Sequence, residues 1–380
     1  MTMLDARDET SHLESVAIKE EKLLVASQWQ LIRWKFARHR LAVVALIVLI
    51  IFYVAAAFAE FVAPYSPGHY DADLTLAPPQ WLHFFDDGRF QWRPFVYGVS
   101  SAYDANTFET VYTQDQSLKY PIYLFAQGDP YELWGIFKSD RHLFGVKEGT
   151  VFLFGTDNMG RDVLSRVIHG GRVSLSIGLV GIAISSLIGI FIGGISGYYG
   201  GVTDMIIQRI IEFIRSIPTL PLWMALSVAL PPTWTILQVY FGIVIILSLV
   251  GWTGLARVVR GKFLSLREED FVMAARLNGS TEIRTIFKHL LPSFYSHIIA
   301  SLTLSVPGMI LGETALSFLG LGLQAPAVSW GVLLRDAQFI RVLASSPWLL
   351  LPGAFIVVAI LCFNFMGDGL RDAADPYASI

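Results

Sequence analysis

Few residues in the 380-residue sequence have the type and spacing that catalysis or metal binding requires. Glu313 is the one carboxylate expected near the outer end of a membrane-spanning helix. There it would either line a pathway through the membrane or accept hydrogen bonds from the backbone near Ser317. His297 has no second histidine or carboxylate at ligand spacing, which favours packing over metal binding. No GxxxxGKS or GxxxxGKT loop for nucleotide phosphates occurs. We therefore expect no catalytic residue, no metal ligand and no cofactor bound by this chain.

A serine motif in the second apolar run has a packing explanation. Gly194-Ile195-Ser196-Gly197 matches the GxSG pattern of rhomboid-type intramembrane proteases, but no GxxxH partner follows it. Small residues recur every four positions through the same run, at Gly181, Ser185, Gly189, Gly193 and Gly197. Such a ridge lets a second helix approach closely, because lipid gives helices no hydrophobic reason to associate. The pattern therefore predicts helix packing, and the chain is not expected to be an enzyme.

The composition places these residues in a membrane protein. Hydrophobic residues make up 54% of the chain and charged residues 16%, and the mean hydropathy is +0.53. This combination is rare in soluble globular chains. A net charge of -3 and a pI of about 6.2 give no indication of a nucleic-acid partner. Cys362 is the single cysteine, so the chain has no internal disulfide framework.

Charge-free runs predict an all-α polytopic membrane protein with six transmembrane helices. A long charge-free run over 216–256 exceeds one span, and Pro231 and Pro232 divide it. The segment 257–288 holds seven Lys or Arg residues, which assigns it to the cytoplasm. Basic residues before the first span also place the N-terminus inside, and six spans then put both termini in the cytoplasm. The expected spans are 41–59, 173–203, roughly 205–230, roughly 234–256, 293–312 and 342–367.

The same runs divide the chain into regions. We expect a small, β-rich domain over 68–150, outside the membrane, because TFETVYT and KYPIYLF alternate as short strands do. Its aromatic residues are interpreted mainly as the core of this domain, with carbohydrate or partner binding as the alternative. The regions are a cytoplasmic N-terminal segment (1–40), a first transmembrane helix (41–63), an extracytoplasmic insert with an amphipathic segment (64–172), a domain with the other five spans (173–370) and a cytoplasmic tail (371–380).

One charged, amphipathic segment interrupts the apolar runs, DFVMAARLNGSTEIRTIFKHLLP at 270–292. Ser265-Leu-Arg-Glu268 has the form of a capping box and predicts a helix start. Asn278-Gly279 predicts its stop, with Gly279 in a left-handed backbone where a β-branched residue would clash. Ser280 or Thr281 can cap a second helix, which Pro292 is expected to end. Two short helices joined by a tight glycine bend are predicted on the cytoplasmic side.

This segment resembles the EAA loop of importer permeases in the ATP-binding cassette family. Met273 stands where that pattern usually has Glu, and His289 stands where it usually has Ile. The resemblance implies that residues 265–292 dock into a cleft on a separate ATPase subunit and transmit its motion. The positions to which it assigns coupling are Asp270, Ala274, Ala275, Arg276, Gly279, Leu291 and Pro292.

Further blocks in the same order resemble the C-type permease subunit of the oligopeptide/dipeptide/nickel group. They are FGTDNMGRDVLSRVIHGGRVSLSIG (154–178), GYYGG (197–201), LVGWTGLARVVRG (249–261), ETALSFLGLGLQAPAVSWGVLL (313–334) and NFMGDGLRDAADP (364–376). The resemblance implies a type I importer fold in the bacterial cytoplasmic (inner) membrane, as a long-insert variant. It further implies import of oligopeptides, dipeptides or oligosaccharides.

The partners that the resemblance implies are a second homologous permease, two ATP-binding cassette ATPase subunits and a soluble extracytoplasmic substrate-binding protein. ATP and Mg would be used by the ATPase subunits. Two other classes of function are disfavoured by the residues. A secondary transporter would typically show inverted repeats with broken helices, and no such duplication is found. An intramembrane enzyme would need a facing nucleophile and base, and no convincing pair exists.

Overall fold

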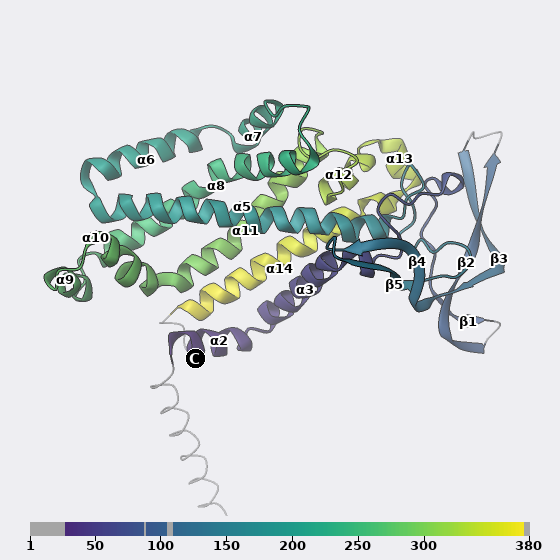
Figure 1. Ribbon diagram of the computed structural model, residues 1–380, viewed down its shortest axis with the longest axis horizontal. Helices are drawn as coiled ribbons and strands as arrows, with labels where there is room; N and C mark the ends of the chain where they lie inside the picture. Colours follow the sequence, from purple (N-terminus) through teal and green to yellow (C-terminus); the bar gives the residue numbers. More distant parts are fainter. Residues whose placement is uncertain (1–26, 87–88, 105–108, 376–380) are drawn as a thin grey trace, which may run out of the picture.

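Five of the helical segments that the structure describes are long and apolar enough to cross a membrane. The computed structural model describes residues 27–86, 89–104 and 109–375. Long helices lie side by side, and a β-rich part lies at one end of them (Figure 1). The five segments are Arg40–Ala57, Val163–Tyr199, Ile236–Leu266, Glu282–Phe318 and Pro347–Ala374. The prediction of a helical membrane protein is confirmed at this level. The first 26 positions of the predicted N-terminal segment and the last five of the predicted tail lie outside the described residues.

Side-chain caps fix where several helices begin. The Asp162 carboxylate accepts the backbone N–H of Ser165 at 2.8 Å, and Thr235 forms a capping box with Gln238. The helices are α2 (Gln28–Arg38), α3 (Arg40–Ala57), α4 (Ala59–Val62), α5 (Val163–Tyr199), α6 (Gly201–Ser216), α7 (Thr219–Val228), α8 (Ile236–Leu266), α9 (Asp270–Leu277), α10 (Glu282–Arg284), α11 (Tyr295–Phe318), α12 (Trp330–Leu334), α13 (Ile340–Ser345) and α14 (Leu351–Ala374).

The prediction of one helix over 205–230 is wrong. The chain forms α6 and α7 there, separated at Ile217 and Pro218. Ile217 has φ -85° and ψ 129°, an extended conformation. A proline disfavours the helical conformation of the residue before it and has no N–H to continue the ladder. The charge-free run therefore contains a break that its hydropathy does not reveal.

The two C-terminal spans have different bounds from those predicted. The helix expected over 293–312 begins at Tyr295 and continues to Phe318. The helix expected from residue 342 is divided, because α13 ends at Ser345 and Pro347 opens a new turn before α14 begins at Leu351. The two helices therefore end six and seven residues later than predicted, at Phe318 and Ala374.

The glycine ridge packs α5 against α8, as predicted. A Cβ on Gly193 would lie 2.5 Å from the carbonyl oxygen of Ala256, and one on Gly197 would lie 2.7 Å from that of Arg260. Only glycine permits these backbones to approach so closely. Ser196 of the GxSG motif is fully buried and donates to an Asp204 carboxylate oxygen at 2.5 Å. Ser196 therefore lies in a contact between α5 and α6.

The insert contains the predicted β-strands. β1 (His83–Asp86), β2 (Arg89–Asp104) and β3 (Glu109–Pro121) form an antiparallel three-stranded sheet, and β4 (Tyr123–Leu133) pairs with β5 (Phe137–Gly145) as an antiparallel hairpin. The interpretation of the insert's aromatic residues mainly as a core is wrong for its tryptophans. The exposed fractions are 72% for Trp81, 92% for Trp92 and 53% for Trp134. Phe95, another aromatic residue of the insert, is buried as predicted, at 2% exposure.

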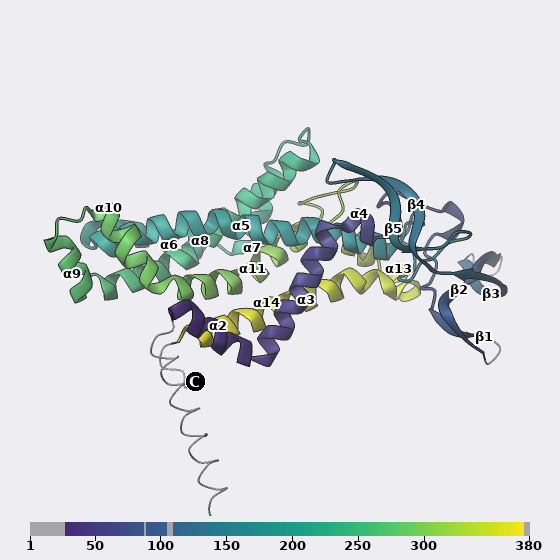
Figure 2. The same ribbon diagram turned by 60° about the horizontal axis from the view of Figure 1, so that its bottom comes forward.

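The bundle has two distinct ends. We call the end that carries the strands the insert end, and the end that carries α9 and α10 the loop end (Figures 1 and 2). The described part of the chain starts and finishes toward the loop end, where α2 and the C-terminal end of α14 lie together. The Lys35 ammonium donates to the Asp375 carbonyl at 2.9 Å and joins these two segments.

Candidate functional site

The amphipathic segment at the loop end begins later than predicted. α8 continues through Ser265 to Leu266, so the capping box at 265–268 does not start a helix. α9 begins at Asp270, with Glu269 at its N-cap position and without a side-chain cap bond. The physical reason is that α8 remains packed there, with Phe263 fully buried one turn before the helix ends. Asp270 is exposed in the first turn of α9.

The predicted glycine bend is present at Gly279. Its φ is +75°, in the left-handed region. The Gly279 N–H donates to Arg276 O at 3.0 Å, and the Ser280 N–H donates to Ala275 O at 3.1 Å. These two bonds form a Schellman motif, which satisfies carbonyls that the helix end leaves free. A Cβ at position 279 would meet no heavy atom within 4 Å. Space around position 279 therefore admits a Cβ, and the positive φ is what favours glycine there.

The second helix does not end at Pro292. Thr281 caps α10 by accepting the Arg284 N–H at 3.4 Å. The chain then stays helical, through a wider π turn over 285–290 and a 3-10 turn over 291–294. Pro292 lies in the first turn of that 3-10 segment, where a missing N–H costs little. α10 is thus joined to α11 by successive helical turns, with Phe294 (φ -133°, ψ 25°) as the N-cap residue of α11.

Buried residues fix α9, the Gly279 bend and the helical turns that follow it to the ends of α5 and α8. We call these segments together the loop-end unit. Val272 and Leu290 are fully buried, and Leu291 is 6% exposed. They belong to one apolar cluster whose other buried members are Tyr198, Leu255, Val259, Phe263, Phe294 and Ile298. The Arg276 guanidinium lies over the Tyr198 ring at 5.0 Å from its centroid. Of the predicted coupling residues, Leu291 belongs to this cluster, and Ala275 is buried at 9% exposure.

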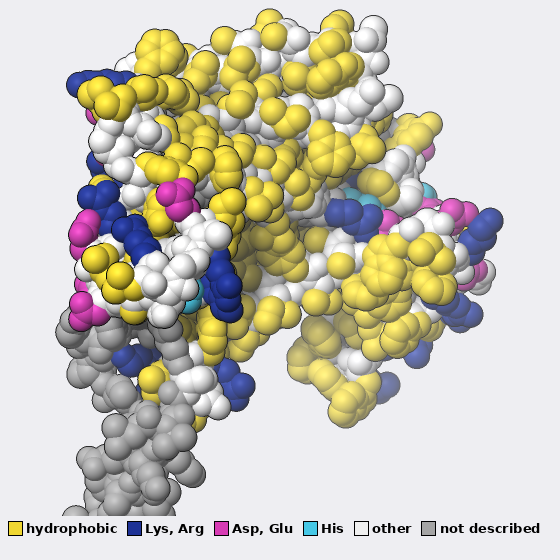
Figure 3. Space-filling view, turned by 60° about the vertical axis from the view of Figure 1, so that its left-hand side comes forward, with side chains coloured by type: hydrophobic (Ala, Val, Ile, Leu, Met, Phe, Trp, Pro, Cys, Tyr) yellow, Lys and Arg dark blue, Asp and Glu magenta, His cyan; other side chains and the backbone are white. Residues whose placement is uncertain are grey.

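Several exposed side chains of the same unit are apolar. The largest exposed fractions are 87% for Leu277, 72% for Ile283 and 49% for Phe287, followed by Met273 and Phe271. Charged side chains gather around the ends of the molecule, and hydrophobic surface lies between them (Figure 3). Exposed apolar residues set among charges are typical of a contact surface for another protein. Sequence reasoning missed Leu277, although its position directly before the Asn278-Gly279 stop could have indicated its exposure.

An ion pair between α6 and α8 near the loop end was not predicted from the sequence. The Arg260 guanidinium of α8 donates twice to the Asp204 carboxylate of α6, with both distances 2.5 Å. Such two-pronged pairs fix geometry as well as adding energy. Ser196 of α5 and Gln208 of α6 extend the network. The only indication of this pair in the sequence is that Asp204 and Arg260 each lie beside a long apolar run.

At the insert end, Glu313 occupies the centre of a buried serine network. Its carboxylate accepts hydroxyl donors from Ser174 at 3.1 Å, Ser317 at 2.8 Å and Ser329 at 2.7 Å. Glu313 has no exposed surface. Of the two predicted roles, this placement favours packing, although the donors are side chains from three elements instead of nearby backbone.

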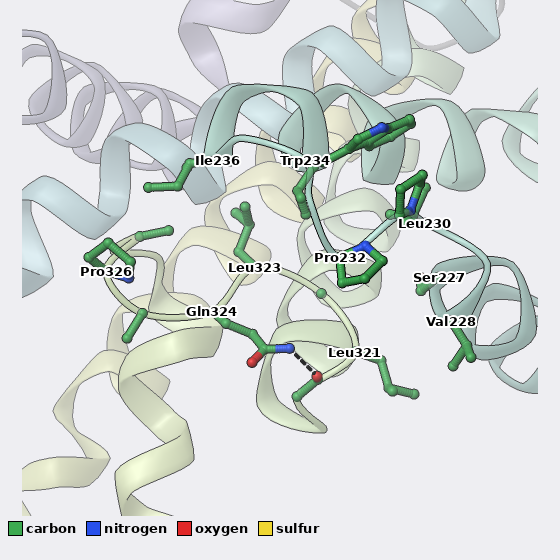
Figure 4. Close-up of a pocket in the computed structure, with 16 residues that line it drawn as sticks. Ser227, Val228, Leu230, Pro232, Trp234, Ile236, Leu321, Leu323, Gln324 and Pro326 are labelled. Atoms are coloured by element: carbon green, nitrogen blue, oxygen red, sulfur yellow. Dashed lines mark hydrogen bonds between the residues drawn. The ribbon is translucent and has the colours of Figure 1, made fainter.

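A cavity of about 530 Å³ opens at the insert end (Figure 4). Its walls come from two connecting segments with their flanking helix ends, residues 227–239 and 320–327. No charged side chain lines it, and Gln324 in its wall donates to Gly320 O at 2.7 Å. His297 lies far from it along α11, and no group of three or more possible metal ligands occurs among the described residues.

Two family models match the chain. The model described as binding-protein-dependent transport system inner membrane component matches residues 189–379, which include the Gly279 bend and Glu313. This chain belongs to that family. A second model, the N-terminal TM domain of oligopeptide transport permease C, matches residues 27–79. The strands and the first part of α5 lie between the two matched ranges.

Relatives of this permease carry the names of peptide transport proteins. The oligopeptide transport system permease protein OppC of Haemophilus influenzae is 46% identical over 224 residues, which cover 59% of this chain and 70% of that protein. The dipeptide transport system permease protein DppC of Bacillus subtilis is 42% identical over 59% of this chain and 68% of its own. This permease is therefore of the OppC/DppC type, as the sequence motifs indicated.

A solved structure of the MetNI methionine ABC transporter in an inward-facing conformation is more distant. It covers 55% of this permease and 97% of its own chain at 17% identity, with a TM-score of 0.43. A similarity of this size supports no argument about residues or function.

Proposed function

We propose that this chain is a permease subunit of an ATP-driven, binding-protein-dependent importer of oligopeptides or dipeptides. The peptide substrates come from the names of the OppC and DppC relatives. No observation adds support to oligosaccharides as an alternative. The proposed partners are a second permease of the same family, two ATPase subunits that use ATP and Mg, and a soluble substrate-binding protein. The proposed location is the bacterial inner membrane.

The unit formed by α9, the Gly279 bend and α10 is the main support for this proposal. Its buried side chains pack on α5 and α8, and it exposes Leu277 and Ile283, while Phe287 is exposed in the π turn that follows. A rigid, partly apolar projection of this kind suits a protein cleft. Because α10 continues into α11, movement of the projection would move a membrane-spanning helix with it.

The same proposal includes the ATPase contact, the location of the termini and a sixth membrane crossing. Residues 265–292 contact the ATPase, and both termini are cytoplasmic. α6 and α7 together make a sixth crossing, since α5 ends at the loop end and α8 begins at the insert end (Figure 1). The uncharged cavity at the insert end then opens on the side where substrate arrives. Walls without charge fit a permease that accepts peptides with varied side chains.

A substitution at Gly279 tests the coupling role. Left-handed backbone costs most residues about 1–2 kcal/mol, and valine more than asparagine. We expect the Gly279→Val complex in lipid to retain its subunits but to lose the rise in ATP hydrolysis that loaded binding protein causes. Gly279→Asn should keep most of that rise, because asparagine tolerates the left-handed region.

Gly261→Val is the matched control. Gly261 lies in α8 near the same end and has no positive φ, and a Cβ there would meet no heavy atom within 4 Å. We therefore expect normal stimulation of this variant. Co-purification of the ATPase with each variant separates loss of coupling from loss of assembly. Normal stimulation of the Gly279→Val complex would contradict the assignment of this bend to coupling.

A further inference from the structure

The turn between β4 and β5 lies against the end of the first membrane-spanning helix. The Trp134 indole N–H donates to the Ala57 carbonyl at 2.8 Å. The Trp134 ring packs on Phe58, with 5.1 Å between the ring centroids. The hairpin folds back from the insert toward the helices, beside α3 and α4 (Figures 1 and 2). The turn is therefore positioned at the level where α3 ends.

Polar bonds hold this arrangement. The Arg172 guanidinium of α5 donates to Ala56 O at 2.9 Å and to Ala57 O at 3.2 Å. Both its terminal nitrogens also donate to the Glu60 carboxylate, at 2.6 Å each. Trp134 and Arg172 thus satisfy carbonyls that the end of α3 leaves free. The Trp134 contacts therefore fix the hairpin turn against the end of α3, and Arg172 joins that end to α5.

The turn itself is apolar and exposed. The exposed fraction is 53% for Trp134, 72% for Ile136 and 60% for Phe137. One residue pair further along the hairpin, Glu132 lies opposite Lys138, with 3.3 Å between the carboxylate and ammonium groups. The hairpin therefore changes from apolar to charged within one pair of residues. That order is typical of a segment that enters a membrane interface only to a limited depth.

The apolar turn is continuous with a surface that faces lipid. α3 presents exposed aliphatic side chains along its length, including Ile47, Ile51 and Val54 at 51–58% exposure. A shallow apolar groove of about 400 Å³ runs between α3, α5 and α14 and reaches Ala57 and Phe58, the two residues that contact Trp134. In a membrane-spanning helix such a surface is covered by acyl chains.

We propose that the β4–β5 turn inserts into the interfacial layer of the leaflet on the insert side and is covered by phospholipid. Trp134 lies at the level where tryptophan is enriched in membrane proteins, and Ile136 and Phe137 extend the apolar surface of α3 into that layer. Lys138 remains among the headgroups. The β1–β2–β3 sheet, which carries Trp92, projects away from the helices and stays in water (Figure 1).

Depth-dependent fluorescence quenching tests this proposal. An environment-sensitive fluorophore is attached at Ile136→Cys, with Phe137→Cys as a second position and Trp92→Cys as the matched control, each with Cys362→Ser. The full importer complex is placed in phosphatidylcholine nanodiscs that carry a nitroxide on the fifth or the twelfth acyl carbon. We expect blue-shifted emission and several-fold stronger quenching at 136 and 137 than at 92. Quenching should be stronger for the shallower nitroxide.

Two outcomes would overturn the proposal. Equal, weak quenching at all three positions would place the turn in water. Quenching of the isolated chain that disappears in the complex would show that a protein subunit, and not lipid, covers the turn. Because all three positions are exposed, we expect each cysteine variant to fold, and binding-protein-dependent uptake by cells that express it checks this. Failure of the Gly279 coupling test would leave this result unaffected.

Discussion

At the scale of single residues, Glu313 shows how one buried carboxylate can organise several backbone segments. Each of its three serine donors also accepts a backbone N–H: Ser174 from Trp330 at 3.1 Å, Ser317 from Leu323 at 3.0 Å and Ser329 from Val332 at 3.2 Å. The carboxylate orients three hydroxyls, and each hydroxyl fixes a piece of the chain near α12. A buried polar network of this kind is stable only when every member is paired.

Two substitutions separate this positioning role from a role in the transport path. Glu313→Gln keeps an oxygen for Ser317 and Ser329 and a polar group toward Ser174, so we expect near-normal melting temperature and uptake. Glu313→Leu removes the acceptor of all three hydroxyls, and a buried polar group without a partner costs about 1–3 kcal/mol. Its melting temperature in detergent should fall clearly. Lost uptake by Glu313→Gln with unchanged melting temperature would instead support a role in the path.

At the scale of elements, the junction of the insert is part of the helical scaffold. The Gln80 N–H donates to Phe152 O at 2.9 Å, and the Gln80 side chain accepts the Phe152 N–H at 2.6 Å. Thr156 accepts the Ala77 N–H at 2.7 Å. Gly160 has φ +75°, and a Cβ there would lie 1.8 Å from the Asp71 carbonyl oxygen. The predicted insert boundaries at 68 and 150 therefore cut through packed structure.

Two deletions test where the insert ends. Replacing residues 83–145 with a short Gly/Ser linker removes the strands and leaves the paired positions 80 and 152 to close the gap. We expect this variant to insert and remain folded, but to respond more weakly to the binding protein. Replacing 68–150 removes Asp71 and Ala77, which hold the turn before α5, and should reduce the folded yield. Membrane yield, detergent melting temperature and uptake are measured for both. Equal folded yields would contradict the boundary at Gln80 and Phe152.

At the scale of the whole molecule, local signals in the sequence predicted most helices and missed contacts between distant segments. Charge-free runs located α3, α5, α8 and α11, and the motif Asn278-Gly279 located the bend. The partners of Glu313 could not be predicted, because Ser174 is 139 residues away from it. The Asp204–Arg260 pair joins residues 56 apart for the same reason. Exposure of the insert's tryptophans was missed because composition does not distinguish a core from a surface.

The path of the chain through the membrane provides the last prediction. α6 and α7 have 16 and 10 residues, which correspond to about 24 Å and about 15 Å of helix. Together they can cross a hydrocarbon core of about 30 Å, although neither does so alone. With Cys362→Ser, a cysteine at Thr233 should react with an impermeant maleimide added to the insert side, as should one at Ser101. Ala274→Cys should react only from the opposite side, and a reporter after Ile380 should be cytoplasmic. Labelling of Thr233→Cys only from the side of Ala274→Cys would contradict the sixth crossing, because α8 could not then begin at the insert end.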